Sequence, residues 1–293
     1  LRMKARSFAA QSKNSPLSFY EFDRREPNEL DVEIEIKYSG ICHSDIHTAK
    51  GDWGEVEYPC VPGHEIIGVV TRVGEKVTKF KPGDIVGVGV MVNSCNECAA
   101  CKSDYEQYCE NGPVYTYSSK DPIDGTDTKG GYSDLIVTTE KFVVHIPEGL
   151  DLSKAAPLLC AGITMYSPLK QWKIGPGKKV GIIGLGGLGH MGVKYAKALG
   201  AEVWVITSSK EKSNDAKKFG ADGVIVSEEE SEMSKHTRGF DLLIDTIPVE
   251  HNLDKYLPLL NINATIVLVG PINPMPGYHG GDLIAGRKSI AGS

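Results

Sequence analysis

The chain has 293 residues, 41% of them hydrophobic, and a formal net charge of −6. This composition is ordinary for a globular protein, and the length predicts two domains. The acidic balance argues against a nucleic acid or an anionic membrane as a partner, because both usually require a basic surface. The N-terminal residues lack the apolar stretch of a signal peptide, and no segment approaches the roughly 20 apolar residues needed to span a bilayer. The sequence therefore predicts a cytoplasmic protein without a membrane partner.

The first half of the chain is rich in predicted β-strands. Residues 32–38 alternate apolar and polar side chains with period two, and residues 66–73 form a β-branched run. A turn leads into a further strand at 85–88, and 110–131 is predicted to be a long surface loop because it is rich in Gly, Pro, Ser, Thr and Asp. This pattern predicts a β-rich domain over residues 1–154.

Short apolar strands alternate with helical segments in the second half, from residue 155 to 293. The predicted strands are 179–184, 202–207, 224–226, 242–246 and 265–270, and the predicted helices are 189–199 and 210–219. Strands separated by helices indicate βαβ units and a parallel sheet. This half is therefore predicted to be a doubly wound α/β domain.

Four of the seven cysteines lie close together in the sequence, at Cys95, Cys98, Cys101 and Cys109. In a reducing compartment, clustered cysteines indicate a metal site more often than disulfides. Four thiolates at these spacings can surround one tetrahedral zinc ion and leave no open coordination position, which is typical of a structural site. The alternatives are an iron–sulfur cluster, which also takes four cysteines, or thiols that are merely neighbours.

A glycine-rich sequence follows the predicted strand 179–184 and opens the next helix. Its residues are Gly184, Leu185, Gly186, Gly187, Leu188 and Gly189. The glycines permit a tight turn and a close approach of the backbone to a pyrophosphate, which rests on the start of the helix. In this strand–turn–helix context, the motif predicts dinucleotide binding.

The end of the next strand predicts which dinucleotide is bound. A strand that binds NAD would end in Asp or Glu, which bonds the ribose 2′-hydroxyl. Here the strand ends in Thr207, Ser208 and Ser209, and Lys212 follows. The missing carboxylate removes repulsion of a 2′-phosphate, to which hydroxyls donate and Lys212 adds charge. NADP(H) is therefore predicted, and the alternative is an ordinary polar turn with a solvated lysine.

Cys42, His64 and Cys160 are candidates for a second metal site. A catalytic zinc needs about three protein ligands and one exchangeable position. Spacing alone favours each residue only weakly, because an isolated His or Cys is more often part of the core or surface.

Several motifs occur together, and in the order found in the zinc-containing medium-chain alcohol dehydrogenases. They are 40–45 around Cys42, Gly63-His64-Glu65 with Gly68, the cysteines of 95–109, and 158–164 around Cys160. The runs 58–65, 130–133 and 161–169 resemble the cinnamyl alcohol dehydrogenase branch, including its NADP-dependent broad-range aldehyde reductases. The resemblance covers essentially the whole chain. It implies a β-rich, GroES-like catalytic domain followed by a Rossmann cofactor domain.

The resemblance also implies the ligands of the catalytic zinc. It implies that Cys42, His64 and Cys160 hold the metal. Glu65 matches a residue that lies beside the zinc and exchanges onto it. Asp45 matches a carboxylate that orients His64, which is a common way to fix a metal-bound imidazole.

Three further residues match positions close to the reacting groups. Ser44 matches the hydroxyl that bonds the substrate alcohol, and His47 matches the histidine that relays its proton toward solvent. Thr164 matches a position near the nicotinamide. The cofactors implied are two Zn²⁺ ions per chain and NADP(H).

The predicted function is reversible hydride transfer between NADP(H) and primary alcohols or aldehydes, with a small molecule as the substrate. The alternatives are a zinc polyol or secondary-alcohol dehydrogenase, and a fragment that binds NADPH without turnover. Because relatives often dimerise through the cofactor domain, a homodimer of this kind is also expected.

Members of the family return to the catalytic domain after the cofactor domain. This sequence stops at 286–293, which matches the last strand of the cofactor domain. The chain is therefore expected to be a fragment without the C-terminal segment of its catalytic domain. It is expected to be less soluble and less active than a longer version, because uncovered apolar surface costs roughly 25 cal/mol per Å².

Overall fold

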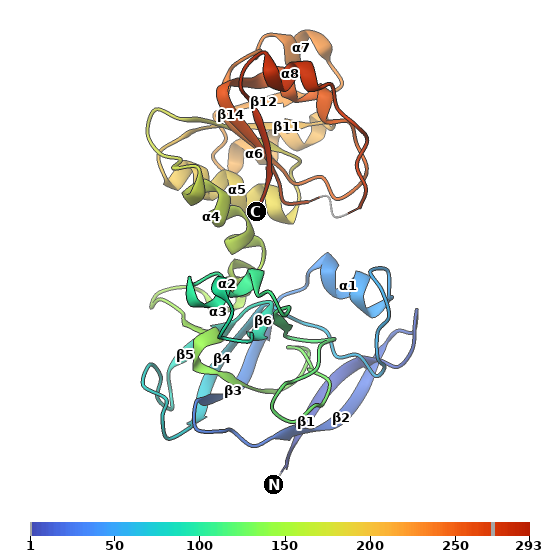
Figure 1. Cartoon of the computed structure of the whole chain (residues 1–293), viewed down its shortest axis with the longest axis vertical. Coiled ribbons are helices and arrows are strands. Elements are labelled where there is room, and N and C mark those ends of the chain that lie inside the picture. The colour runs from blue at the N-terminus through green and yellow to red at the C-terminus, as the bar shows by residue number, and fades with distance from the viewer. Residues whose placement is uncertain (1, 271–272) are drawn as a thin grey trace. The chain divides into compact units, whose positions relative to one another are not determined.

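The computed structural model describes residues 2–270 and 273–293. It divides into two compact units between Cys160 and Ala161 (Figure 1). The expected boundary after residue 154 falls inside helix α3 (Leu152–Ala155), shortly before this division. Within the described ranges, no helix is both long and apolar enough to cross a membrane.

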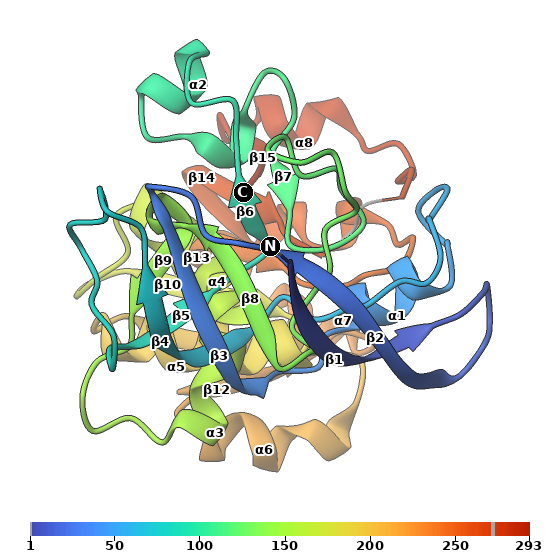
Figure 2. The same ribbon diagram turned by 90° about the horizontal axis from the view of Figure 1, so that it is seen from below.

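Antiparallel strands build the first unit. Its main sheet has the strand order β8-β3-β4-β5-β9 among the described residues, and Figure 2 shows β3, β4 and β8 side by side. The strands are β3 (Asp31–Ser39), β4 (Ile66–Val73), β5 (Ile85–Val88), β8 (Leu135–Thr139) and β9 (Val143–His145). The strands predicted at 32–38, 66–73 and 85–88 are confirmed.

One apolar cluster holds the main sheet together. Val32 and Ile34, two of the alternating residues of β3, are fully buried and pack with Ile66, Val86 and Ile136 from neighbouring strands. Fully burying one such side chain stabilises the fold by about 1.5–3 kcal/mol. The apolar positions of the period-two pattern of β3 therefore pack in this core, and the polar position between them, Glu33, is buried as well.

Short elements surround this sheet. Two further two-stranded sheets pair β1 (Arg2–Ala10) with β2 (Leu17–Arg25) and β6 (Met91–Asn93) with β7 (Val114–Tyr115). The helical elements are α1 (His43–Ala49), α2 (Ala99–Lys102), η1 (Glu106–Tyr108), η2 (Glu140–Phe142), α3 and η3 (Ala156–Leu159). The predicted loop 110–131 is irregular apart from β7 and one isolated bridge.

A parallel sheet forms the second unit. Among the described residues its strand order is β12-β11-β10-β13-β14-β15, and all neighbours are parallel. The strands are β10 (Lys179–Ile183), β11 (Glu202–Thr207), β12 (Gly223–Val226), β13 (Phe240–Asp245), β14 (Leu260–Leu268) and β15 (Ser289–Gly292). The strand order reverses between β10 and β13, which makes this edge the expected ligand-binding edge of a doubly wound sheet.

Helices cover both faces of the parallel sheet. One core includes residues of α4 (Ala161–Gln171), α5 (Gly187–Ala198) and α6 (Ser213–Lys218). The core on the other face includes α7 (Glu230–Ser234), η5 (Leu253–Lys255) and η6 (Leu257–Leu259). The prediction of βαβ units is thus confirmed.

Several boundaries differ from the sequence prediction in the second unit, and the largest shift is in β14, which is predicted at 265–270 but spans Leu260–Leu268. The helix predicted over 210–219 is divided into η4 (Lys210–Lys212) and α6. The strand predicted at 242–246 begins two residues earlier, at Phe240, and ends at Asp245. Phe240 is fully buried, so the strand already begins within the core. The last helix is α8 (Gly280–Ile284).

Candidate active site and metal centres

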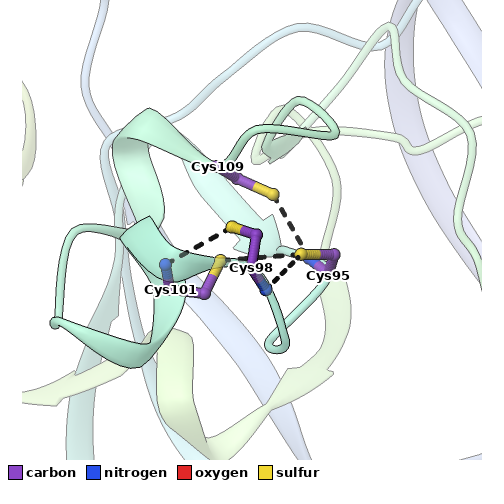
Figure 3. A group of neighbouring side chains, drawn as sticks. All are labelled: Cys95, Cys98, Cys101 and Cys109. Carbon is purple, nitrogen blue, oxygen red and sulfur yellow. Dashed lines mark hydrogen bonds between the residues drawn. The ribbon is translucent and has the colours of Figure 1, made fainter.

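Four cysteine sulfurs meet around α2 and η1 in the first unit (Figure 3). The Sγ atoms of Cys95, Cys98, Cys101 and Cys109 lie within 4.8 Å of one another. Cys95 Sγ and Cys101 Sγ are 3.9 Å apart. A tetrahedral ion with metal–sulfur bonds of about 2.3 Å separates its sulfurs by about 3.8 Å. The spacing therefore fits one zinc ion, whereas an iron–sulfur cluster places iron and sulfide between its cysteines and needs more room.

Backbone amides point at these sulfurs. The amide of Cys98 donates to Cys95 Sγ at 3.4 Å, and those of Cys101 and Glu110 donate to Cys98 Sγ at 3.5 and 3.4 Å. The amides of Glu97 and Cys98 lower the pKa of Cys95 to about 6, and those of Cys101 and Glu110 lower the pKa of Cys98. These amides thus favour the thiolate form of Cys95 and Cys98, which is the form that binds metal.

A second group of potential ligands lies elsewhere in the first unit. The ligand atoms of Cys42, His64, Glu65 and Cys160 lie within 4.8 Å of one another. Cys42 precedes α1, His64 and Glu65 precede β4, and Cys160 follows η3. Cys42 Sγ and Cys160 Sγ are 4.0 Å apart, again close to the separation of two sulfurs on one zinc ion.

The two sulfurs of this second group favour a bound cation. The hydrogen bond with Cys160 lowers the pKa of Cys42 to about 3, and the same contact raises the pKa of Cys160. Two thiolates this close repel each other, so both ionise only if positive charge is placed between them. A divalent ion provides that charge and deprotonates coordinating thiols. The donor set, two sulfurs, one imidazole and one carboxylate, fits zinc.

Asp45 fixes the geometry of this group. Its Oδ1 accepts hydrogen bonds from His64 Nδ1 and the Gly63 amide, both at 2.9 Å. Its Oδ2 accepts from the Cys42 amide at 2.9 Å and from Tyr132 Oη at 3.2 Å. Burial raises the pKa of Asp45, but the bonds from His64 and the Cys42 amide outweigh this and hold it below its usual value. The carboxylate thus occupies Nδ1 of His64 and leaves Nε2 for a metal.

Glycines bring these segments into contact. Gly63 has φ +103°, and a Cβ there would lie 2.8 Å from the Gly131 amide nitrogen. The Gly131 amide donates to Gly63 O at 2.8 Å, and the Tyr132 amide donates to Pro62 O at 2.9 Å. Because no side chain separates the two backbones, Tyr132 reaches Asp45. The glycine-rich run at 130–133 therefore helps to fix Asp45 and, through it, His64.

Gly40 makes room for Glu65. The Gly40 amide donates to Glu65 O at 2.9 Å, and a Cβ on Gly40 would overlap Glu65 Oε2. Glu65 is 3% exposed, so its carboxylate has little freedom to move away. A side chain at position 40 would therefore displace a carboxylate that lies beside the sulfurs.

Helix α1 follows Cys42 directly and carries two of the predicted site residues. Ser44 and His47 are three positions apart and so lie on one face of the helix. His47 Nδ1 is 2.9 Å from Asp52 Oδ2, and its ring centroid is 5.0 Å from that of Trp53. The side chains of His47 and Asp52 are 40% and 43% exposed, which gives this pair direct access to solvent.

Three residues beside the site were not predicted from the sequence. Tyr132 bonds Asp45, Asp52 pairs with His47, and Tyr117 places its Oη 3.3 Å from His64 Nδ1. Asp52 is only five residues from His47, so an acidic residue this close to the histidine in the sequence could have indicated the pair. The two tyrosines are 53 and 87 residues from theirs, and nothing in the sequence indicates those contacts.

The dinucleotide motif forms the turn between β10 and α5 in the second unit. Gly184 has φ +90°, which favours glycine, and a Cβ on Gly189 would overlap Gly184 O. A Cβ on Gly186 or Gly187 would meet nothing within 4 Å, so the backbone there is open to a ligand. Leu185 is 9% exposed and anchors the turn in the core. The glycines thus have the separate roles expected of a pyrophosphate-binding turn.

The remaining predicted cofactor residues also lie in the second unit. Thr207 ends β11, is 6% exposed and accepts a hydrogen bond from the Ser209 amide at 3.2 Å. Ser208 and Lys212 are exposed at the surface. Thr164 lies near the start of α4 and is partly buried, and Leu188 lies in the first turn of α5.

The sequence matches known dehydrogenases along nearly its whole length. A family described as "Alcohol dehydrogenase GroES-like domain" matches residues 28–148, and one described as "Zinc-binding dehydrogenase" matches 187–293. The Escherichia coli protein named "Aldehyde reductase YahK" is 47% identical over 99% of this chain and 84% of its own length. The chain belongs to the zinc-dependent medium-chain alcohol dehydrogenase family.

Other relatives of this dehydrogenase show similar identity. "NADP-dependent alcohol dehydrogenase C" of Mycobacterium bovis is 49% identical over 98% of this chain and 83% of the relative. A protein named "Probable mannitol dehydrogenase 1" of Stylosanthes humilis is 49% identical over 99% of this chain and 82% of the relative.

Solved structures share the fold of this dehydrogenase. A cinnamyl alcohol dehydrogenase from Sorghum bicolor has a TM-score of 0.94 at 45% identity and covers 99% of this chain and 83% of its own. A Helicobacter pylori enzyme of the same name, complexed with NADP(H), has a TM-score of 0.91 at 43% identity and covers 100% of this chain and 84% of its own. The predicted GroES-like and Rossmann folds are confirmed.

Proposed function

We propose that this dehydrogenase reversibly reduces aldehydes to primary alcohols with zinc and NADP(H). The observation that carries the proposal is the group of Cys42, His64, Glu65 and Cys160, whose ligand atoms lie within 4.8 Å of one another. Ser44 and His47 lie on helix α1, which directly follows Cys42. Three ligands and one exchangeable position are the requirement of a catalytic zinc site. The names of the relatives support the same reaction class.

Four residues of this chain would hold the catalytic zinc. Cys42, Cys160 and His64 Nε2 are the proposed ligands, and Glu65 would lie close enough to compete with substrate for the metal. When bound, zinc acts as a Lewis acid toward the carbonyl or alcohol oxygen. Asp45 keeps the imidazole of His64 in one tautomer and orientation through its 2.9 Å hydrogen bond to Nδ1.

The proposed proton path runs along α1. Ser44 donates its hydroxyl proton to the alkoxide oxygen of the product during reduction and accepts a proton from the alcohol during oxidation. His47 passes the proton to or from solvent, because its side chain is 40% exposed and an imidazole can both accept and donate a proton. Asp52 holds the ring of His47 by the 2.9 Å contact at Nδ1, which leaves Nε2 for the proton.

The four cysteines at Cys95, Cys98, Cys101 and Cys109 would hold a second zinc ion. Because four protein ligands leave no position for substrate, this ion is proposed to be structural. The amides that donate to the sulfurs support the choice of a thiolate-bound metal.

The end of β11 supports NADP(H) as the hydride carrier. Thr207, Ser208 and Ser209 place hydroxyls where an NAD-binding strand carries a carboxylate, and Lys212 is exposed nearby. The Helicobacter pylori structure with NADP(H) and the name of the Mycobacterium bovis relative agree with this choice. Thr164 and the 184–189 turn are proposed to bind the nicotinamide side and the pyrophosphate, respectively.

Cofactor kinetics test this proposal. We expect kcat/KM with an aromatic aldehyde to be higher for NADPH than for NADH. Ser208→Asp should move the ratio toward NADH by about tenfold or more, because it adds a carboxylate that repels the 2′-phosphate. Ser234→Asp adds the same charge at an exposed position of α7 and should leave the ratio unchanged. Equal use of both cofactors by the unaltered chain would contradict the proposal.

A polyol substrate is the second candidate, because a relative named "Probable mannitol dehydrogenase 1" is 49% identical to this chain. A screen of aromatic aldehydes, aliphatic aldehydes, mannitol, sorbitol and 2-propanol separates the two candidates. Highest kcat/KM for an aldehyde supports the first candidate, and highest kcat/KM for a polyol supports the second.

We also propose a cytoplasmic homodimer. All seven cysteines are free thiols, which fits a reducing compartment. In the described part of the sheet, β15 is the last strand, so one side of its backbone is available to pair with a second copy. Light scattering after size-exclusion chromatography measures the mass. An Ile290→Pro variant in β15 should lower it if the strand edge forms the interface.

A further inference from the structure

A buried acid–base pair closes a loop at the end of β13. The Asp245 side chain is fully buried and the His251 side chain is 14% exposed, with Oδ2 and Nε2 2.7 Å apart. The second carboxylate oxygen, Oδ1, accepts the Ile247 amide at 3.0 Å. His251 Nδ1 donates to Val249 O at 2.7 Å. One carboxylate and one imidazole thus fix both ends of the segment 246–251.

The pair is held by hydrogen bonds whichever group carries the shared proton. A carbonyl oxygen only accepts, so Nδ1 of His251 carries a proton. Nε2 then either donates to an ionised Asp245 or accepts from a protonated one. A buried polar pair generally adds little to stability compared with apolar side chains of similar size. Stability alone therefore does not account for this pair.

The loop closed by the pair lies at the reversal of strand order. Thr246 donates to Ile183 O, the last residue of β10, through its amide at 3.0 Å and its hydroxyl at 2.7 Å. A Cβ on Gly184, the first glycine of the dinucleotide motif, would lie 2.7 Å from Thr246 Oγ1. The segment 246–251 therefore packs directly against the proposed pyrophosphate turn.

The same carboxyl residue also fixes the end of β14. The amides of Val269 and Gly270 donate to Asp245 O at 3.0 and 3.1 Å. A Cβ on Gly270 would overlap the Thr246 backbone, so these segments touch without side chains between them. Asp245 thus ties the loops after β13 and β14 to each other.

The path of the cofactor follows from this arrangement. The 2′-phosphate is assigned to the end of β11 and the pyrophosphate to the turn after β10. In a doubly wound sheet the dinucleotide crosses the point where the strand order reverses. The other half, the nicotinamide riboside, therefore extends over the ends of β13 and β14.

We propose that Asp245 and His251 are positioning residues for the nicotinamide half of the cofactor. Their pairing holds the segment 246–251 and the end of β14 in the conformation against which the nicotinamide riboside rests. The inference depends on the proposed use of NADP(H). Neither residue needs to touch the cofactor.

Two ligands of the full chain separate this role from general folding. NADPH contains both halves, and adenosine 2′,5′-bisphosphate contains only the adenine half. His251→Ala should raise the Kd of NADPH by about tenfold, because the side-chain hydrogen bond that holds the segment 246–251 is lost. The Kd of the bisphosphate should stay within about twofold. Titration calorimetry measures both constants.

Conservative variants keep the test decisive. His251→Gln retains an N–H donor toward Asp245, and Asp245→Asn retains an acceptor for the Ile247 amide and donates to a neutral His251. Both should bind NADPH within about threefold of the unaltered chain. Glu250→Ala, at an exposed position of the same segment, is the matched control and should change neither constant.

The outcomes distinguish the possible explanations. Equal weakening of both ligands by His251→Ala, or no weakening of NADPH, would overturn the positioning role. If His251→Ala does not fold, His251→Asn, whose shorter amide does not reach Asp245, takes its place with the same expectation. Failure of the unaltered chain to bind NADPH would overturn the cofactor proposal itself, which is a different result from selective loss in the variant.

Discussion

The two cysteine-containing clusters of the first unit bring potential metal ligands together in different ways. The cluster of Cys95, Cys98, Cys101 and Cys109 draws its sulfurs from fifteen consecutive residues, and amides of the same loop donate to them. The second cluster collects ligands from residues 42 to 160 and depends on one carboxylate for their orientation. The first is therefore a local structure, and the second depends on the tertiary fold.

This difference explains why the second cluster, and not the first, is suited to binding substrate. A closed set of four thiolates satisfies a zinc ion and stabilises the loop that provides it. When ligands come from distant segments, neighbouring side chains such as Asp45 and Glu65 can change the positions of the ligand atoms. We therefore expect changes to the first cluster to affect stability and changes to the second to affect turnover.

The largest expected effect is on turnover in the second cluster. Cys160→Ser should reduce kcat by about 10³-fold or more, since loss of the Lewis acid removes several kcal/mol of transition-state stabilisation. Zinc content should fall by one ion per chain while the melting temperature changes little. Steady-state kinetics and metal analysis of the purified variant measure both. Activity within tenfold of the unaltered chain would show that this cluster is not the reaction centre.

The next effect is on stability in the first cluster. Cys101→Ser should remove the other zinc ion and lower the free energy of unfolding by about 2–3 kcal/mol, because bound metal stabilises only the folded loop. The kcat of the remaining folded protein should stay within about fivefold. Urea unfolding and metal analysis measure these changes. Cys60→Ser is the matched control, because Cys60 is 2% exposed but belongs to neither cluster.

A smaller effect should follow from loss of the charge that orients His64. Asp45→Asn keeps the shape of the side chain but weakens its bonds to His64 Nδ1 and the Gly63 and Cys42 amides. Zinc affinity of the second cluster should fall by about 10–100-fold, and the four-cysteine cluster should be unaffected. Competition with a chromophoric chelator resolves the two ions. Equal weakening of both would mean that the clusters are not independent.

The smallest effect tests a single hydrogen bond. Tyr132→Phe removes the 3.2 Å bond to Asp45 Oδ2 and leaves the ring in place. Loss of one such bond costs about 1 kcal/mol, so zinc affinity at the second cluster should fall about fivefold. The same chelator competition measures it. A loss as large as that of Asp45→Asn would place the main control of the site at Tyr132 instead.

Local patterns allowed much of the fold to be predicted from the sequence. Strand β3 alternates apolar and polar residues, β4 is a β-branched run, and the glycines of 184–189 follow an apolar strand, so these features have short-range signals. The β1–β2 hairpin has no such signal. Strand β2 is exposed along most of its length, with only Phe22 buried, and shows no clear alternation of apolar and polar residues.

Some features of the candidate site could likewise be predicted from the sequence, and others could not. The four-cysteine cluster can be recognised from the short separations of its cysteines in the sequence. The ligands of the second cluster follow from the resemblance to a known family. The pairing of Asp245 with His251 and the reach of Tyr132 to Asp45 depend on how the chain turns between them. Such contacts have no counterpart in composition or periodicity.

Asp45 has a consequence for how the site responds to its metal. The same carboxylate accepts the Cys42 amide at the start of α1 and the Gly63 amide beside His64, besides bonding His64 itself. The beginning of the helix and the metal ligand should therefore open together as one unit. Hydrogen exchange at the amides of Cys42 and Gly63 should slow in concert when zinc is added, and these two protons would report the state of the site without any substrate.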